Sequence, residues 1–189
     1  RGGRLDIAVI SAGDYFFPGL LAEFCRRHER VTVRLTVNNR EEIVHQLEQN
    51  TTDLAVLLRP PGNPDMIAEA FAPQPHVIVA APGHALARKR HISLQAVANE
   101  AFIVREQGSD TRLAMEELLA ECRVKFNVTM EIKSTETIKQ AVIAGMGISF
   151  LSAHTIGREL EAGRLAVLDV EGFPVMREWH IVHHKNKRL

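Results

Sequence analysis

The stretch AFIVREQGSDTRLAMEELLAEC, residues 101–122, joins a strand pattern to a helix pattern through a short polar elbow. AFIV is a continuous apolar run, which is typical of a strand that is covered on both faces. The run LAMEELLAEC is amphipathic and favours a helix. Between them lie a glycine, a serine and several charged residues. The elbow therefore either caps the helix or contributes to a binding site.

The same alternation extends outward over the whole chain. Strand patterns cover residues 5–10, 31–37, 53–58, 76–81, 101–104, 128–132, 147–151, 165–170 and 178–184. Helix patterns cover residues 17–28, 41–49, 111–122, 137–145 and 154–163. This order predicts βαβ units with a mostly parallel sheet between helices. Because the rhythm occurs once before about residue 80 and once after it, we predict two α/β lobes. The join is itself a strand pattern, so extended crossover segments should connect the lobes, with a cleft between them.

Composition and charge exclude some classes of protein. Lys+Arg and Asp+Glu both number 23, and this balance argues against a nucleic-acid-binding surface in this segment. No apolar run approaches the ~20 residues of a membrane span. The chain begins with Arg1 and has no signal-peptide pattern, so we expect a fragment of a longer, cytoplasmic protein. Cys25 and Cys122 lie far apart inside helix patterns, so we expect small core residues rather than a disulfide.

Four strand-to-helix elbows carry polar residues: SAGDY (11–15), NNR (38–40), EQGSDTR (106–112) and STET (134–137). In open α/β sheets, ligands bind beyond the carboxyl ends of strands, where helix N-termini offer N–H groups to an anion. Ser11, Ser109 and Ser134 could each serve only as helix caps. However, hydroxyls, amides and arginines gather at the corners where this architecture builds its sites, and arginine suits phosphate or carboxylate recognition. We therefore expect the elbows to face a common anion-binding cleft.

Signs of an enzyme or a metal site are absent from the sequence. It contains no G-x-S-x-G elbow, no P-loop and no G-x-G-x-x-G motif. Its nine histidines form no zinc pattern, and His183 and His184 should point to opposite faces of a strand. The scattered histidines, among them His76, are expected at the surface. We predict neither catalysis nor a bound metal.

In their order and spacing, five segments resemble the effector-sensing domain of LysR-type transcriptional regulators. The segments are GRLDIAVISAGDYFFPGLLAEF, NNREEIVHQLEQNTTDLAVLLRPP, HVIVAAPGHALA, EQGSDTR and STETIKQAVIAGMGISFLS. The resemblance extends over essentially all 189 residues. The segments LDVEGFPVMREWHIVHHKNKRL and RPPGNPDMIAEAF are most similar to the branch that regulates Calvin-cycle (RuBisCO) operons.

The resemblance implies a periplasmic-binding-protein-like (type II) fold with two Rossmann-like lobes. Lobe I would be residues 1–80 plus 178–189, and lobe II residues 81–177. The family's N-terminal winged helix-turn-helix domain is absent from this chain. A non-covalent effector would bind in the interlobe cleft, with ribulose bisphosphate, phosphoenolpyruvate and NADPH as candidates and with no cofactor. The implied ligand-binding residues are Ser11, Ala12, Asn38, Asn39, Arg59, Pro60, Gly108, Ser109, Asp110, Thr111, Arg112 and Thr135.

One position departs from the family pattern. The family often has Gly-Ser-Gly-Thr-Arg at the third elbow, whereas this chain has Asp110 at the central position. A carboxylate there would repel a phosphate, by ~1 kcal/mol when solvated. Asp110 could instead point outward, or favour a less charged ligand.

The implied function is effector sensing by a transcription regulator of carbon-fixation genes. The resemblance also implies a homodimer, in which helix 17–28 and strand 31–37 of one chain meet lobe II of the other. The full-length protein would be a tetramer that contacts DNA only through the missing domain. An alternative is a solute-binding protein of a transporter with the same fold, which a leader sequence before Arg1 would favour. An enzyme built on this fold is a third reading, without a nucleophile–base pair to support it.

Overall fold

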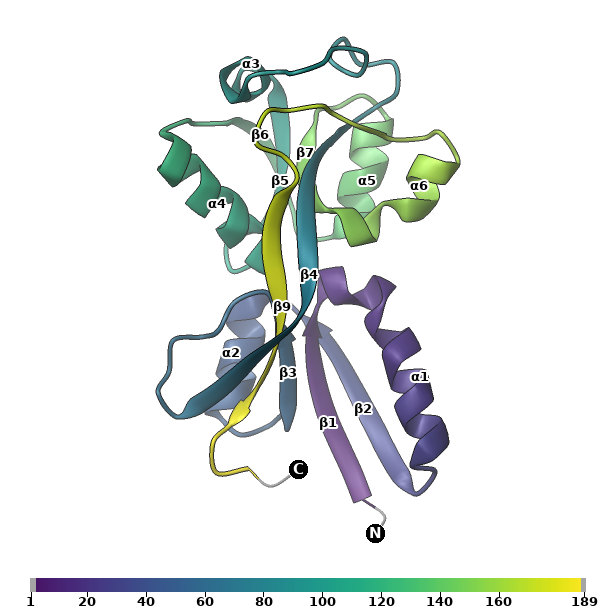
Figure 1. Ribbon diagram of the computed structural model, residues 1–189, viewed down its shortest axis with the longest axis vertical. Coiled ribbons are helices and arrows are strands. Elements are labelled where there is room, and N and C mark those ends of the chain that lie inside the picture. Colours follow the sequence, from purple (N-terminus) through teal and green to yellow (C-terminus); the bar gives the residue numbers. More distant parts are fainter. Residues whose placement is uncertain (1–2, 188–189) are drawn as a thin grey trace. The chain divides into compact units, whose positions relative to one another are not determined.

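The computed structural model describes residues 3–187, which form two compact units (Figure 1). Unit 1 contains the chain up to Pro73, the tripeptide Gly108–Asp110 and the chain from Glu178 onward. Unit 2 contains Gln74–Gln107 and Thr111–Arg177. The chain therefore passes from one unit to the other inside two long strands, β4 (Met66–Ala80) and β9 (Val175–His184), and again on either side of the tripeptide.

The sheet of unit 1 is built around a central parallel strand, β1 (Gly3–Ile10). It pairs in parallel with β2 (Val31–Asn38) and β3 (Leu54–Leu57), and β9 pairs antiparallel with β3. The helical elements of this unit are η1 (Ser11–Tyr15), α1 (Phe17–Arg27) and α2 (Arg40–Glu48). Because α2 packs on β1 and β3, its apolar residues Ile43 and Leu47 are buried against the sheet. The carboxyl ends of three parallel strands thus lie at one edge.

Unit 2 contains the second set of strands. In it β4 pairs antiparallel with β7 (Ser149–Ser152) and β8 (Ala166–Val167), while β5 (Ala101–Arg105) and β6 (Asn127–Ile132) pair in parallel. The helical elements are α3 (Leu94–Ala98), α4 (Asp110–Cys122), α5 (Thr135–Ile143), η2 (Ala153–Thr155) and α6 (Gly157–Glu161). Buried Ile103, Ile138 and Leu151 belong to one apolar cluster that joins α5 to β5 and β7.

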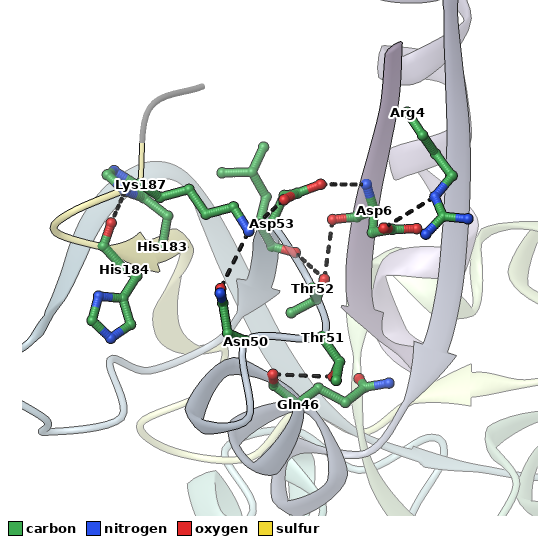
Figure 2. A network of polar contacts seen from close by, with 11 residues as sticks. Arg4, Asp6, Gln46, Asn50, Thr51, Thr52, Asp53, His183, His184 and Lys187 are labelled. Carbon is green, nitrogen blue, oxygen red and sulfur yellow. Dashed lines mark hydrogen bonds and ion pairs between the residues drawn. The ribbon is translucent and has the colours of Figure 1, made fainter.

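A polar network lies at the amino-terminal end of β3 in unit 1 (Figure 2). The Asp53 carboxylate accepts the Asp6 N–H at 2.7 Å and pairs with the Lys187 ammonium. Burial alone would raise the pKa of Asp53, but Lys187 and the Asp6 N–H outweigh it and hold that pKa below its usual value. Thr52 Oγ1 donates to the Asp6 and Leu54 carbonyls. The network ties the end of the described chain to β1 and β3, at the end of β3 opposite the carboxyl edge.

Three expectations about elements are wrong in detail. The sheets are not mostly parallel, because β7, β8 and β9 all pair antiparallel. Strand β4 begins at Met66, ahead of the predicted residue 76, since Pro73 and Pro75 interrupt its pattern without ending it. The helix predicted at 154–163 is divided into η2 and α6, because Ile156 leaves helical geometry to bury its side chain.

Two expectations about single residues also fail. Cys25 and Cys122 are free and exposed, so they are not core residues. Both lie on helix faces that the units leave open. His76 is not at the surface but fully buried, with its ring stacked on that of Phe150 at 5.0 Å. A strand pattern of alternating apolar residues carries no signal that would distinguish such a histidine from an exposed one.

Candidate functional site

The carboxyl edge of the unit 1 sheet carries the first group of predicted site residues. Ser11 and the buried Ala12 follow β1 in η1. Asn39 follows β2, and its Oδ1 accepts the Glu42 N–H at 3.0 Å as the cap of α2. The side-chain amide of Asn38 lies over the same helix, beside Glu42. The side-chain amides of Asn38 and Asn39 thus both lie at the start of α2, and that of Asn39 caps the helix.

Arg40 is the central cation of this edge, and the sequence did not single it out. Its guanidinium donates to the carbonyls of Arg59 at 2.6 Å and Pro60 at 3.0 Å. It also pairs with Asp110 Oδ1 at 3.0 Å. The other Asp110 oxygen accepts the Leu58 N–H at 2.8 Å. Arg40 therefore joins the residues that follow β3 to the elbow at 106–112.

Asp110 points inward, so the outward orientation considered from the sequence is wrong. Its side chain is only 1% exposed and that of Arg40 is 14% exposed. Burial raises the pKa of the Asp110 carboxyl, although the Arg40 charge and the Leu58 N–H both act to lower it. Because these two donors hold the carboxylate, Asp110 forms a fixed ion pair at the N-terminal end of α2.

Gly108 allows this tripeptide to approach α2 closely. Its carbonyl accepts the Glu41 N–H at 3.1 Å, in the first turn of the helix. Its φ of +94° is a conformation that favours glycine, and a Cβ there would lie 2.6 Å from Glu41 Oε2. The neighbouring Ser109 is buried. Gly108 and Asp110 thus differ from a simple cap of α4, because they accept hydrogen bonds from α2 and from the residue that follows β3.

A second group of residues lies in unit 2, where β5 ends and α5 begins. The Arg105 side chain is 5% exposed, and its guanidinium donates to Thr135 Oγ1 at 3.1 Å. The same guanidinium pairs with both carboxylate oxygens of Glu106, at 2.8 and 3.3 Å. Ser134 caps α5 by accepting the Thr137 N–H at 3.2 Å. A buried cation therefore lies beside a hydroxyl at a helix N-terminus, a combination that suits an anionic group.

Arg112 supports this group from α4. Its guanidinium donates to the Arg105 carbonyl at 2.9 Å and to Glu116 at 2.8 Å. Thr111, the residue before it, is buried. The structure thus brings Arg112 and Thr135 together through Arg105, which was not among the predicted ligand-binding residues. The only sequence signal for Arg105 and Glu106 was their place directly after a buried strand.

Within each unit, the predicted residues form a connected set. In unit 1, Asn39, Arg59, Pro60, Gly108 and Asp110 gather around Arg40 and the start of α2. In unit 2, Arg112 and Thr135 gather around Arg105. The convergence of both sets on one cleft stays a prediction. Among residues 3–187, no group of His, Cys, Asp or Glu side chains is arranged to hold a metal ion.

Residues 1–189 match the LysR substrate binding domain. The chain belongs to this family. The predicted family and its periplasmic-binding-protein-like α/β fold are thereby confirmed. No helix within residues 3–187 has the length and apolar character needed to cross a membrane.

The relatives of this LysR-type domain are transcription regulators. The HTH-type transcriptional activator CmpR of Synechocystis sp. is 45% identical over 189 residues, which are 100% of this chain and 62% of the relative. The RuBisCO operon transcriptional regulator of Allochromatium vinosum is 46% identical over 187 residues, 99% of this chain and 62% of that protein. The chain thus spans less than two thirds of the length of these relatives. The predicted similarity to RuBisCO operon regulators is confirmed.

The solved structures that are similar to this chain include regulatory and effector-binding domains. The regulatory domain of Synechocystis CcmR, in complex with 2-PG, matches with a TM-score of 0.93 at 41% identity, covering 99% of this chain and 90% of that one. The effector binding domain of QuiR, in complex with shikimate, matches with a TM-score of 0.88 at 22% identity, covering 100% and 90%. The second similarity shows a shared fold alone.

Proposed function

We propose that this LysR-type domain senses a small phosphorylated acid, such as 2-phosphoglycolate, for a regulator of carbon-fixation genes. The observation that carries the proposal is the 41% identity, over nearly the whole chain, to a CcmR regulatory domain in complex with 2-PG. Similarity to named RuBisCO operon regulators supports the same genes as targets. Ribulose bisphosphate, phosphoenolpyruvate and NADPH stay candidate effectors.

The anionic group of the effector is assigned to Arg105 and Thr135 in unit 2. A guanidinium presents paired N–H donors that match a phosphate, and a nearly buried one is screened little by water. The first turn of α5 adds backbone N–H groups and a favourable dipole. Glu106 balances the Arg105 charge in the absence of effector. From unit 1 we propose contributions by Ser11, Ala12, Asn38, Asn39, Arg59 and Pro60, and from the elbow by Ser109, Thr111 and Arg112.

Calorimetric titration of this chain with 2-phosphoglycolate and the three other candidates tests the proposal. We expect saturable binding of at least one phosphorylated ligand, and no binding of shikimate, which lacks phosphate. Arg105→Gln should weaken that binding about tenfold to a hundredfold, because a hydrogen bond to a charged group contributes ~1.5–3 kcal/mol. Arg88→Gln, at an exposed arginine of the same unit, is the matched control. The absence of binding by all four ligands would refute the assignment.

Effector binding would act by shifting a conformational population. An effector changes the balance of two states only by its difference in affinity for them. In a full-length regulator, that shift would reach DNA through an N-terminal DNA-binding domain. Comparing DNA binding by the full-length protein with and without the effector measures the shift directly.

We also propose that two copies form an antiparallel homodimer, and that full-length chains form a tetramer. In unit 1, Leu20 of α1 and Val37 of β2 are large apolar residues exposed on neighbouring elements. In unit 2, a groove of about 590 Å³ at α4 and the start of β6 is lined by Leu119, Phe126 and Val128 together with charged residues such as Arg123 and Lys125. The apolar part of this groove suits the exposed apolar residues of unit 1. Sedimentation should detect a dimer that Leu20→Glu dissociates, whereas Ile67→Glu, at another exposed apolar position, should leave it intact.

A further inference from the structure

The start of α2 has the features of an anion site, yet the chain itself satisfies them. The Glu42 N–H is donated to Asn39 Oδ1 and the Glu41 N–H to the Gly108 carbonyl. The Arg40 guanidinium pairs there with the Asp110 carboxylate. Two backbone N–H groups and one guanidinium that would attract a phosphate to this helix end therefore already have internal partners.

The Asp110 carboxylate is held by the donors that would hold a bound anion, and it is not a counter-ion on the surface. One carboxylate oxygen lies 3.0 Å from Arg40 Nη1 and the other 2.8 Å from the Leu58 nitrogen. A bound carboxylate or phosphate would use the same two kinds of donor, a guanidinium and a backbone N–H. Only 1% of the side chain is exposed, so the carboxylate is shielded from water, whereas 14% of the Arg40 side chain is exposed.

We propose that Asp110 is a built-in anion that occupies the Arg40 guanidinium and the Leu58 N–H, and thereby keeps the effector's anionic group from binding at the start of α2. The inference rests on the proposed function for the identity of the effector, but not for the pairing of Asp110 with Arg40. Asp110 is thus a positioning residue that determines specificity. It also holds Arg40 where the guanidinium organises the carbonyls of Arg59 and Pro60.

The first test replaces the charge and keeps the shape. In Asp110→Asn, the amide oxygen can still accept the Leu58 N–H, but Arg40 loses its counter-charge. Titration with inorganic phosphate should then reveal one additional site per chain, at least about tenfold tighter than any phosphate binding by Arg40 in the unaltered chain. Asp110→Asn combined with Arg40→Gln should abolish that site. Asp65→Asn, at an exposed carboxylate of unit 1 that pairs with Lys185, is the matched control.

Combination with Arg105→Gln separates this inference from the proposed function. In Asp110→Asn/Arg105→Gln, phosphate should still bind, through Arg40 alone. If that double variant binds phosphate while Arg105→Gln by itself does not weaken effector binding, the proposed function fails and the role of Asp110 stands. If folded Asp110→Asn gains no phosphate site, the role of Asp110 is overturned whatever the effector is.

A second variant keeps the test decisive if Asp110→Asn fails to fold. Asp110→Gly restores the residue that the family often has at this elbow and leaves space beside Arg40. Added phosphate should restore folding of Asp110→Gly in a concentration-dependent manner, as followed by circular dichroism, because the anion replaces the lost carboxylate. Chloride at matched ionic strength should not. Equal rescue by both salts, or rescue by neither, overturns the proposal.

Discussion

Lowering the pH should destabilise this domain through one histidine, His76. The side chain is fully buried in β4 and stacks on Phe150 with the ring planes 7° apart. Neither ring nitrogen has a hydrogen-bond partner among residues 3–187. Burial lowers the pKa of His76 from 6.5 to about 3, and the nearby charges of Arg177 and His154 act in the same direction.

The sign and size of the effect follow from proton linkage. Because the pKa of folded His76 lies below that of the unfolded chain, the unfolded state binds a proton first as the pH falls. The contribution of neutral His76 is present above pH ~6.5 and is lost progressively toward pH ~3. For one group with these two pKa values, the loss of unfolding free energy between pH 7 and pH 5 is about 2 kcal/mol, and the limiting loss is about 5 kcal/mol.

Urea unfolding followed by circular dichroism at pH 7 and pH 5 measures this loss. His76→Phe keeps a flat ring against Phe150 but cannot titrate, so it should lose about 2 kcal/mol less than the unaltered chain over the same interval. His45→Gln, at an exposed histidine of α2, should behave like the unaltered chain. Equal pH dependence of the unaltered chain and His76→Phe would refute the reasoning, as would a protonated His76 ring in the nitrogen NMR spectrum at pH 5.

Three further substitutions test the packing around the candidate sites, each by urea unfolding. Asn39→Ala removes the α2 cap and should cost about 1 kcal/mol, whereas Asn39→Asp should cost little. Gly147→Ala places a Cβ 2.6 Å from the Ala101 carbonyl oxygen and should cost about 1–3 kcal/mol; an unchanged stability would contradict the contact. Lys139→Met leaves the Glu159 carboxylate without its buried partner and should cost about 3 kcal/mol, part of which Glu159→Gln should restore.

The sequence predicted the elements better than their pairing. Continuous apolar runs and helical spacing located nearly every strand and helix, because burial on a sheet or a helix face is a local pattern. The partner of a strand is not local. Nothing in the residues of β7 or β9 distinguishes an antiparallel neighbour from a parallel one, so the mixed sheets were missed. The early start of β4 was hidden by Pro73 and Pro75, which interrupt the strand pattern.

The same difference between local and distant partners decides which site residues the sequence could predict. Ser134 was recognised as a potential cap, since a cap and the N–H it accepts lie three residues apart. Arg40 and Arg105 were not recognised as central, because their roles depend on partners distant in sequence. Arg40 meets Asp110 across 70 residues, and Arg105 meets Thr135 across 30. Such pairs arise from the topology of the sheets, which the sequence pattern does not specify.

The elbow at residues 106–112 illustrates why capping and ligand binding are not exclusive explanations. A plain cap would satisfy the start of its own helix, α4. Here Gly108 and Asp110 satisfy groups of another helix and another strand, the Glu41 N–H of α2 and the Leu58 N–H after β3. A buried carboxylate with a raised pKa is costly unless its ion pair is retained. Its presence at this edge therefore argues for a role in keeping Arg40 from binding an added anion.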